Sequence, residues 1–341
     1  MTMITTRKKR TTLALVACLL ALIVISLGSW TRLKHSGLGC PDWPTCYGYF
    51  DVRNAITHVD SVNTVNAGSL RAAEKTIPEM VHRYCASLLG LLVLIITASC
   101  LIKYKSENTP LKLPLFLSGL IIFQGILGKW TVTMGLYPPT VTGHLLGGFL
   151  TLTLLCILTC RLGNLIRIPN DASAIPLIPW VITAIGITLT QIALGGWTAA
   201  NYAAVSCTEF PICESGWAGN LDFVNAFKFW GFEHVRDFEF GVLDLNARTT
   251  IHIFHRFGAI ITLLTVGFVA IKLYKHAKSH FFKRFSYLLL FVLMAQFILG
   301  ISNVAFQIPI AIAVAHNVTG AALLVTLSLL FYSLKQCSEA S

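Results

Sequence analysis

Charged side chains are scarce in this chain of 341 residues, of which only 12% are Asp, Glu, Lys or Arg. A soluble chain carries roughly 25% charged residues, whereas 55% of the residues here are hydrophobic. This composition excludes an ordinary soluble domain and predicts a polytopic membrane protein. Acidic residues are the scarcer charged class, with 15 Asp and Glu against 26 Lys and Arg, which gives a net charge of +11.

Polar interruptions are also rare, and the apolar runs between them approach the roughly 20 residues that a helix needs to cross a bilayer. Eight such runs occur, at about 12–30, 80–102, 113–134, 139–160, 174–197, 250–273, 285–306 and 308–333. The sequence therefore predicts an all-α fold with eight transmembrane helices. The first run follows a basic stretch, as in a signal peptide, but no small-residue cleavage site follows it.

The positions of the basic residues predict the orientation of the chain. With the N-terminus inside, the inner segments carry 15 Lys and Arg against three acids, and the outer segments carry the other 11 against 12 acids. An excess of Lys and Arg in cytoplasmic loops is the usual topology signal. We therefore predict cytoplasmic N- and C-termini, and the net positive charge does not require a nucleic-acid partner.

The chain contains an internal repeat, because each half has a His-Arg pair that opens an apolar run and a second histidine later. His144 follows His82 after 62 positions, and His316 follows His255 after 61. Each repeat contains four predicted helices, an even number, so both halves cross the membrane in the same direction. This predicts two tandem four-helix bundles related by a pseudo-two-fold axis along the membrane normal.

We place the boundary between the two repeats after residue 168. The N-terminal repeat, residues 1–168, then contains a long outer loop at 31–78. The C-terminal repeat, residues 169–341, contains a second outer loop at 198–247 that is rich in Phe and Trp.

The four histidines lie near the outer ends of their predicted helices, so each pair lies at one depth. Ionisable groups inside a membrane are costly and usually mark function, and two imidazoles on neighbouring helices suit the axial positions of a haem iron. We predict that His82 and His144 ligate one haem, and that His255 and His316 ligate another. Hydrogen bonding between helices and zinc are the alternatives, but neither half shows an evident set of four zinc ligands.

Two further residue types support the haem hypothesis. Gly148 and Gly320 lie one helical turn after a predicted ligand, where a missing side chain lets a flat macrocycle approach. Arg83 and Arg256 directly follow a predicted ligand, and we expect them to pair with haem propionates.

The two halves differ beside one predicted ligand, because alignment of His82 with His255 places Glu79 opposite His252. Residues three apart in a helix share a face, so Glu79 lies beside His82. A carboxylate next to a porphyrin can accept protons, and we predict that Glu79 is catalytic. The alternative is that Glu79, directly after Pro78, stabilises a helix N-terminus. His252 is a candidate further ligand in the second half.

Two cysteine pairs share the same spacing in the predicted outer loops. Cys40 and Cys46 are six positions apart, as are Cys207 and Cys213, and each pair has a proline two positions before its second cysteine. Disulfides persist on the oxidising side of a membrane, so we predict two disulfides. A redox-active dithiol is the alternative for the first pair.

Several sequence blocks together resemble the haem A synthase family over nearly the whole chain. They are Thr31-Arg32-Leu33 with Ser36-Gly37-Leu38, Cys40-Pro41-Asp42-Trp43-Pro44, Glu79-x-x-His82-Arg83, Gln124-Gly125-x-Leu127-Gly128 with Trp130-Thr131-Val132, His144-Leu145, His255-Arg256 and His316. The Cys-Pro-Asp-Trp-Pro block is the most specific of these. The second outer loop is longer than the resemblance leads us to expect.

The resemblance implies an oxidoreductase of the bacterial cytoplasmic membrane that oxidises the C8 methyl group of haem O to the formyl group of haem A, with its haem sites toward the outer face. It implies that His82 and His144 ligate the substrate haem beside Glu79, while His255 and His316 ligate a haem b that relays electrons. It also implies haem O synthase as substrate donor and terminal oxidase assembly factors as candidate partners. A diheme b-type electron carrier is the alternative function.

Overall fold

A computed structural model describes residues 2–62, 69–102, 110–165 and 167–340. Within these residues the secondary structure is helical, and eight helices are long and apolar enough to cross a membrane. They are α1 (Thr2–Leu33), α3 (Ser69–Ile102), α5 (Lys112–Thr133), α6 (Pro138–Gly163), α7 (Ile178–Ala200), α9 (Leu245–His276), α10 (His280–Ala305) and α11 (Ile310–Ala340). The predicted all-α, multi-pass membrane fold is confirmed.

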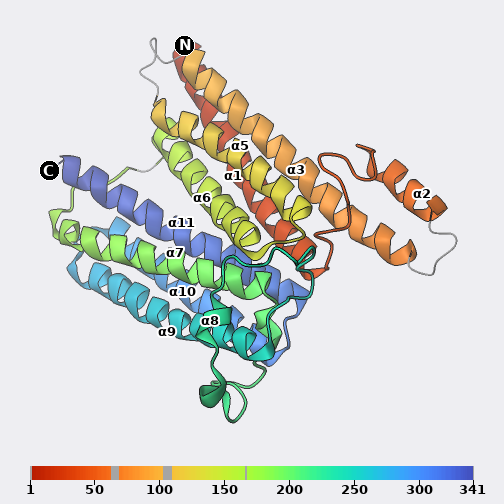
Figure 1. The fold of residues 1–341 in the computed structure, drawn as a ribbon. Helices are drawn as coiled ribbons and strands as arrows, with labels where there is room; N and C mark the ends of the chain where they lie inside the picture. The colour runs from red at the N-terminus through yellow and green to blue at the C-terminus, as the bar shows by residue number, and fades with distance from the viewer. Residues whose placement is uncertain (1, 63–68, 103–109, 166, 341) are drawn as a thin grey trace.

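The long helices pack mainly within two groups of four (Figure 1). In the first group α1 packs against α3 and α6, and α5 packs against α3 and α6; in the second, α7 and α10 each pack against α9 and α11. Contacts of α11 with α1 and α6, and of α6 with α7, join the groups. This arrangement agrees with the repeat expected on either side of residue 168, although the boundary and the symmetry axis remain predictions.

The outer ends of two helices extend beyond the apolar runs that predicted them. Helix α3 begins at Ser69 rather than near residue 80, so Pro78 lies inside it, and α9 begins at Leu245. Hydropathy detects only the lipid-embedded part of a helix, whereas these polar extensions pack against the outer loops. Glu79 therefore lies well inside α3, and the alternative in which it stabilises a helix N-terminus is wrong.

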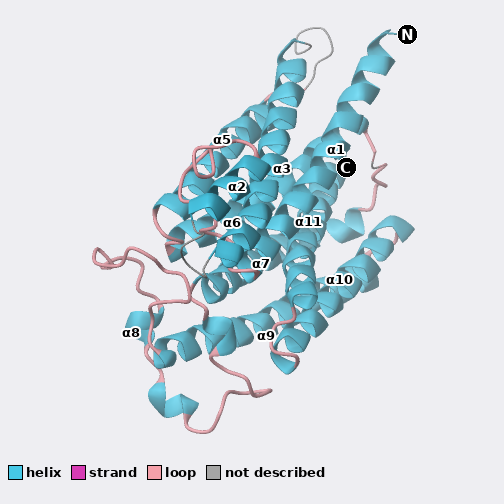
Figure 2. Ribbon diagram, turned by 90° about the vertical axis from the view of Figure 1, so that its right-hand side faces the viewer, coloured by secondary structure: helices cyan, strands magenta, loops and turns pink. Residues whose placement is uncertain are grey.

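Short helices occupy the connections between the long ones, and loops extend around α8 (Figure 2). The short helices are α2 (Val52–Val62), η1 (Ala172–Leu177), η2 (Ala203–Val205), η3 (Trp217–Asn220) and α8 (Phe223–Ala226). Helix α2 packs against α3, and α8 packs against α9. Residues 63–68 of the first outer loop are not among the described residues.

Part of the second outer loop crosses to the first group of helices. This crossing segment, residues 229–240, covers the turn between α5 and α6. The amide of Phe238 donates to the carbonyl of Gly135 over 2.8 Å, and the Tyr137 hydroxyl donates to the carbonyl of Phe229. An ion pair of 3.0 Å between Lys75 and Glu239 adds a contact with α3. The sequence left the role of this loop open, and in the structure it links the two groups of helices.

Candidate functional site

Each of the four predicted histidine ligands lies against a glycine on the neighbouring helix. A Cβ atom added to any of these glycines would lie between 3.0 and 3.5 Å from the imidazole Cε1 atom. The contacts join Gly28 to His82, Gly128 to His144, Gly195 to His255, and Gly300 to His316. The helix pairs involved are α1 with α3, α5 with α6, α7 with α9, and α10 with α11. The same local packing therefore places all four imidazoles.

The first histidine pair has a geometry that suits a shared metal ion. The ring centroids of His82 and His144 lie 6.4 Å apart, and the ring planes are nearly perpendicular at 85°. Metal–imidazole nitrogen bonds are about 2 Å long, so two rings on opposite sides of one metal ion have centroids roughly 6 Å apart. In the second half, His316 and His252 both lie near His255.

Unpartnered polar atoms at both pairs also fit haem ligation. The Nδ1 atoms of His82, His144 and His316 are buried and lack a hydrogen-bond partner within the described part of the chain. Buried polar atoms are normally satisfied, so these ring nitrogens are available to a metal ion or to another partner. A Cβ atom at Gly148 would have open space around it, which agrees with room for a flat ring beside His144, whereas a Cβ atom at Gly320 would lie 3.3 Å from Nε2 of Gln296.

Both carboxylate oxygens of Glu79 are held by neighbouring groups, and the side chain is buried, with Glu79 only 4% exposed. Oε2 accepts from the amide of Cys40 over 2.9 Å, and Oε1 accepts from Nη2 of Arg83 over 2.5 Å. The carboxylate therefore connects helix α3, one turn from His82, to the disulfide loop above it.

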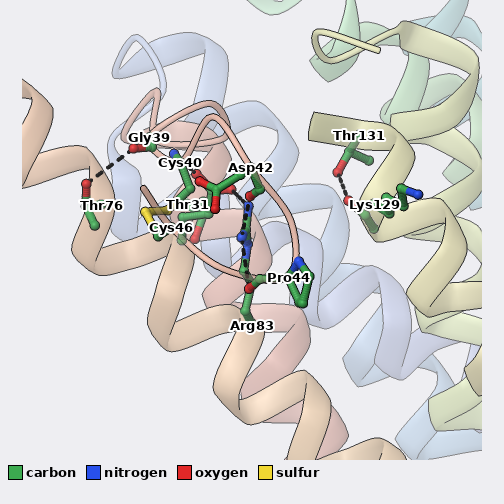
Figure 3. A network of polar contacts seen from close by, with 12 residues as sticks. Thr31, Gly39, Cys40, Asp42, Pro44, Cys46, Thr76, Arg83, Lys129 and Thr131 are labelled. Carbon is green, nitrogen blue, oxygen red and sulfur yellow. Dashed lines mark hydrogen bonds and ion pairs between the residues drawn. A yellow bond between two sulfur atoms is a disulfide. The ribbon is translucent and has the colours of Figure 1, made fainter. Parts of the chain in front are cut away.

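The guanidinium of Arg83 holds this disulfide loop through main-chain carbonyls (Figure 3). Its Nη1 donates to the carbonyls of Asp42 at 2.9 Å, Pro44 at 3.4 Å and Thr45 at 2.7 Å. Its Nη2 donates to the carboxylate of Glu79. Arg83 therefore positions the first outer loop and the carboxylate together.

Arg256 holds the second disulfide loop in the corresponding way. Its Nη1 donates to the carbonyls of Glu209 at 2.8 Å and Pro211 at 3.2 Å, which align with two of the carbonyls that Arg83 contacts. Its Nη2, however, donates to the carbonyl of Cys207 at 2.8 Å. His252, which takes the place of Glu79, is only 5% exposed, and its Nδ1 has no partner among the described residues.

The two predicted disulfides are present, between Cys40 and Cys46 and between Cys207 and Cys213. An acidic side chain stabilises the first loop from within. Burial alone would raise the pKa of Asp42, but hydrogen bonds from the Thr45 hydroxyl and from two loop amides outweigh it and hold this pKa below its usual value.

The acidic side chain of Glu214 stabilises the second disulfide loop in the same way. The hydroxyl of Thr208 donates to its Oε1 over 2.6 Å, and the Thr208 amide donates over 2.8 Å. These hydrogen bonds, with that of the hydroxyl the largest cause, lower the pKa of Glu214 to about 2.

Comparison with known proteins identifies the family of this chain. Residues 11–328 match the model of the COX15-CtaA cytochrome oxidase assembly proteins. The chain belongs to the COX15-CtaA family. It is 45% identical to a heme A synthase of Shewanella oneidensis over 94% of this chain and 95% of the relative. It is also 27% identical to a heme A synthase of a Bradyrhizobium species over 92% of this chain and 87% of the relative. A third heme A synthase, from Allorhizobium ampelinum, is 28% identical over 89% of this chain and 83% of the relative.

In this COX15-CtaA chain the structure brings together residues that sequence reasoning had only paired by spacing. It also shows a contact that we had not predicted. Gln191 lies against His255, and Nε2 of Gln191 is 3.0 Å from Nδ1 of His255. A signal for this contact was present in the sequence, since Gln-x-x-x-Gly recurs on α5, α7 and α10. The loop carbonyls bound by the two arginines had no such signal.

Proposed function

We propose that this protein is a haem A synthase, which oxidises the C8 methyl group of haem O to the formyl group of haem A. The observation that carries the proposal is that two similar histidine pairs differ in one neighbour, Glu79 in the first half and His252 in the second. Two electron carriers would not need this difference. Membership of the COX15-CtaA family and the names of its relatives support the same activity.

In this proposal His82 and His144 hold haem O in the first half, and His255 and His316 hold haem b in the second. When bound, the haem groups supply the redox chemistry. Glu79 accepts a proton as the methyl group is oxidised, and its carboxylate is kept in place by the Cys40 amide and by Arg83. The residues at the two sites therefore have different tasks, reaction in the first half and relay of electrons in the second.

Propionate pairing by Arg83 and Arg256 stays part of the proposal. Nε of Arg256 is buried without a partner in the described chain, so it can donate to a propionate while both terminal nitrogens hold the loop. Arg83 makes the corresponding loop contacts.

We place the protein in the bacterial cytoplasmic membrane, with both termini in the cytoplasm and the haem sites toward the outer face. The excess of basic residues in the inner segments supports this orientation. In this setting haem O synthase supplies the substrate, and terminal oxidases and their assembly factors receive the product.

The haem content of the purified protein tests the proposal. Protein expressed with haem O synthase should contain haem b together with haem O or haem A, which extraction and chromatography identify. His316→Ala should deplete haem b selectively. Haem b alone in the wild-type protein would instead support a diheme electron carrier, and the absence of any Soret band would contradict haem binding and favour a transporter.

A further inference from the structure

Residues 223–232 of the second outer loop form an aromatic segment with almost no charge. The sequence there is Phe-Val-Asn-Ala-Phe-Lys-Phe-Trp-Gly-Phe, so half of the ten residues are aromatic and Lys228 is the one charged residue. A loop surrounded by water does not need such a composition. Segments that lie in the boundary between lipid and water, in contrast, carry Phe, Trp and Leu on their apolar side.

Two hydrogen bonds fix this segment at the outer ends of α7 and α9. The amide of Asp222 donates to the hydroxyl of Thr250 on α9 over 2.9 Å. Nε1 of Trp197 on α7 donates to the carbonyl of Ala226 over 2.8 Å. Helix α8 therefore packs against α9 (Figure 1) at the level where the apolar run that begins at about residue 250 starts.

From Asp222 the chain continues further along the span and not away from it. The rings of Phe223 and Phe227 both contact the ring of Phe254, with centroids 5.4 and 5.7 Å apart. Phe254 lies four residues after Thr250, which is about 6 Å further along the axis of α9 at a rise of 1.5 Å per residue. The two phenylalanine rings therefore lie at a depth inside the apolar run.

At this depth the segment meets an exposed apolar face of α9. Phe254, Phe257, Ile261 and Leu264 are all exposed, and their spacing of three or four positions places them on one face of the helix. An exposed apolar stripe on a helix that crosses a membrane is a surface for lipid. Phe223 contacts the first residue of this stripe and is itself 51% exposed, and Val224 beside it is 83% exposed. The loop therefore continues the apolar surface of the span.

We propose that residues 223–227 are a lipid anchor, in which Phe223 and Val224 contact acyl chains beside the outer end of α9. Interfacial segments place their apolar side chains about 5–10 Å into the boundary between headgroups and acyl chains, which agrees with the level of Phe254. The anchor directly precedes the crossing segment, so it holds the start of that link between the two groups of helices at the membrane surface. It does not depend on haem ligation and goes beyond the proposed function.

Fluorescence of an introduced tryptophan tests this contact with lipid. Val224→Trp is the reporter, and Val205→Trp is the matched control, because Val205 belongs to the same loop and is 61% exposed. Its neighbour Ser206 accepts, through its carbonyl, a hydrogen bond from the hydroxyl of Thr249, which places the control at the polar end of α9. The full-length variants are reconstituted in nanodiscs of phosphatidylcholine, with or without bromine on the upper part of the acyl chains. The emission of the wild-type protein is subtracted.

Bromine should lower the added emission of Val224→Trp by about half or more, because an interfacial side chain lies at the depth of the upper acyl chain. The added emission of Val205→Trp should stay nearly unchanged with bromine and should be quenched by iodide in the water. Phe223→Trp, which keeps an aromatic ring against Phe254, is a second reporter and should lose its emission as Val224→Trp does. Circular dichroism checks that the variants keep their helical content.

Two results would overturn the proposal. Quenching of the Val224→Trp and Phe223→Trp emission by iodide but not by bromine would show that the segment lies in water, free or available to a soluble protein. Emission that responds to neither quencher would show that protein covers the segment, for example a second copy of this chain. Neither result would alter the haem content, so the proposed function is tested separately.

Discussion

The two halves of this protein place their histidines by the same means but differ in what lies around them. In both, imidazoles lie against glycines, and an arginine after the first histidine binds the carbonyls of a disulfide loop. The first half then has Glu79 where the second has His252. The comparison teaches that, under the proposed function, a duplicated scaffold acquires two tasks through a few changed side chains near its histidines.

The contacts of Arg83 and Arg256 show that the structural difference between the two halves is small. Nη1 of Arg83 and Nη1 of Arg256 contact equivalent loop carbonyls, and the two residues differ in the partner of Nη2. In the first half that partner is Glu79, and in the second it is the carbonyl of Cys207. A buried carboxylate could therefore be added to the first half without loss of the loop attachment.

Replacing the residue that distinguishes the halves should have the largest effect. Glu79→His gives the first half the side chain of the second, and it should lower haem A formation by about 100-fold or more, the scale of a lost general acid or base. Both haems should remain bound because their predicted ligands are unchanged. The ratio of haem A to haem O in membranes is the measurement. His252→Ala is the matched control and should change this ratio far less; an unaltered ratio in Glu79→His would remove Glu79 from the reaction.

The arginines should differ in their contribution to stability. Arg83→Ala leaves the carboxylate of Glu79 buried and unpaired, which typically costs about 3–5 kcal/mol. Arg256→Ala removes three hydrogen bonds to loop carbonyls, as Arg83→Ala also does, so this loss is alike in the two variants. Arg256→Ala leaves no buried carboxylate behind. Denaturant unfolding in detergent should therefore rank Arg83→Ala as the less stable variant.

A double variant checks the cause of that difference. Arg83→Ala with Glu79→Gln removes the unpaired charge, so it should recover part of the stability lost in Arg83→Ala. Equal stability of the single and double variants would show that the ion pair is not the source of the asymmetry.

The smallest expected effect concerns the acid stability of the second disulfide loop. The pKa of Glu214 is about 2 in the folded protein, below the value of about 4.3 for an unperturbed Glu. Its contribution to stability is therefore complete above about pH 4.3 and is lost as the pH falls through 2. Hydrogen exchange at the Thr208 amide should lose protection over this range. Glu214→Gln should abolish the pH dependence, and a wild-type amide equally protected at pH 5 and pH 2 would contradict it.

The membrane spans, the disulfides and the pairing of His82 with His144 were predictable because they depend on local hydropathy or on spacing. The apolar run after residue 80 predicts α3 independently of the loop that packs against the end of this helix. Two cysteines six positions apart can meet with little constraint from the rest of the fold.

The outer extension of α3 and the attachment of Glu79 were not predictable in the same way. They depend on a polar helix segment packed beneath a loop, and on a bond to the amide of Cys40, 39 positions away. No periodicity encodes such a contact. The contact of Gln191 with His255 lies between these cases, because its motif recurs in the sequence while its partner becomes evident only in three dimensions.

The crossing segment, residues 229–240, has a consequence for biogenesis. A ribosome finishes the first four long helices well before it reaches residue 240, so the turn between α5 and α6 is exposed while the second half is being made. Phe238 binds this turn, and Glu239 pairs with Lys75 of α3, only afterwards. During that interval the nascent first half offers its outer surface to other molecules in a form that the finished protein no longer presents.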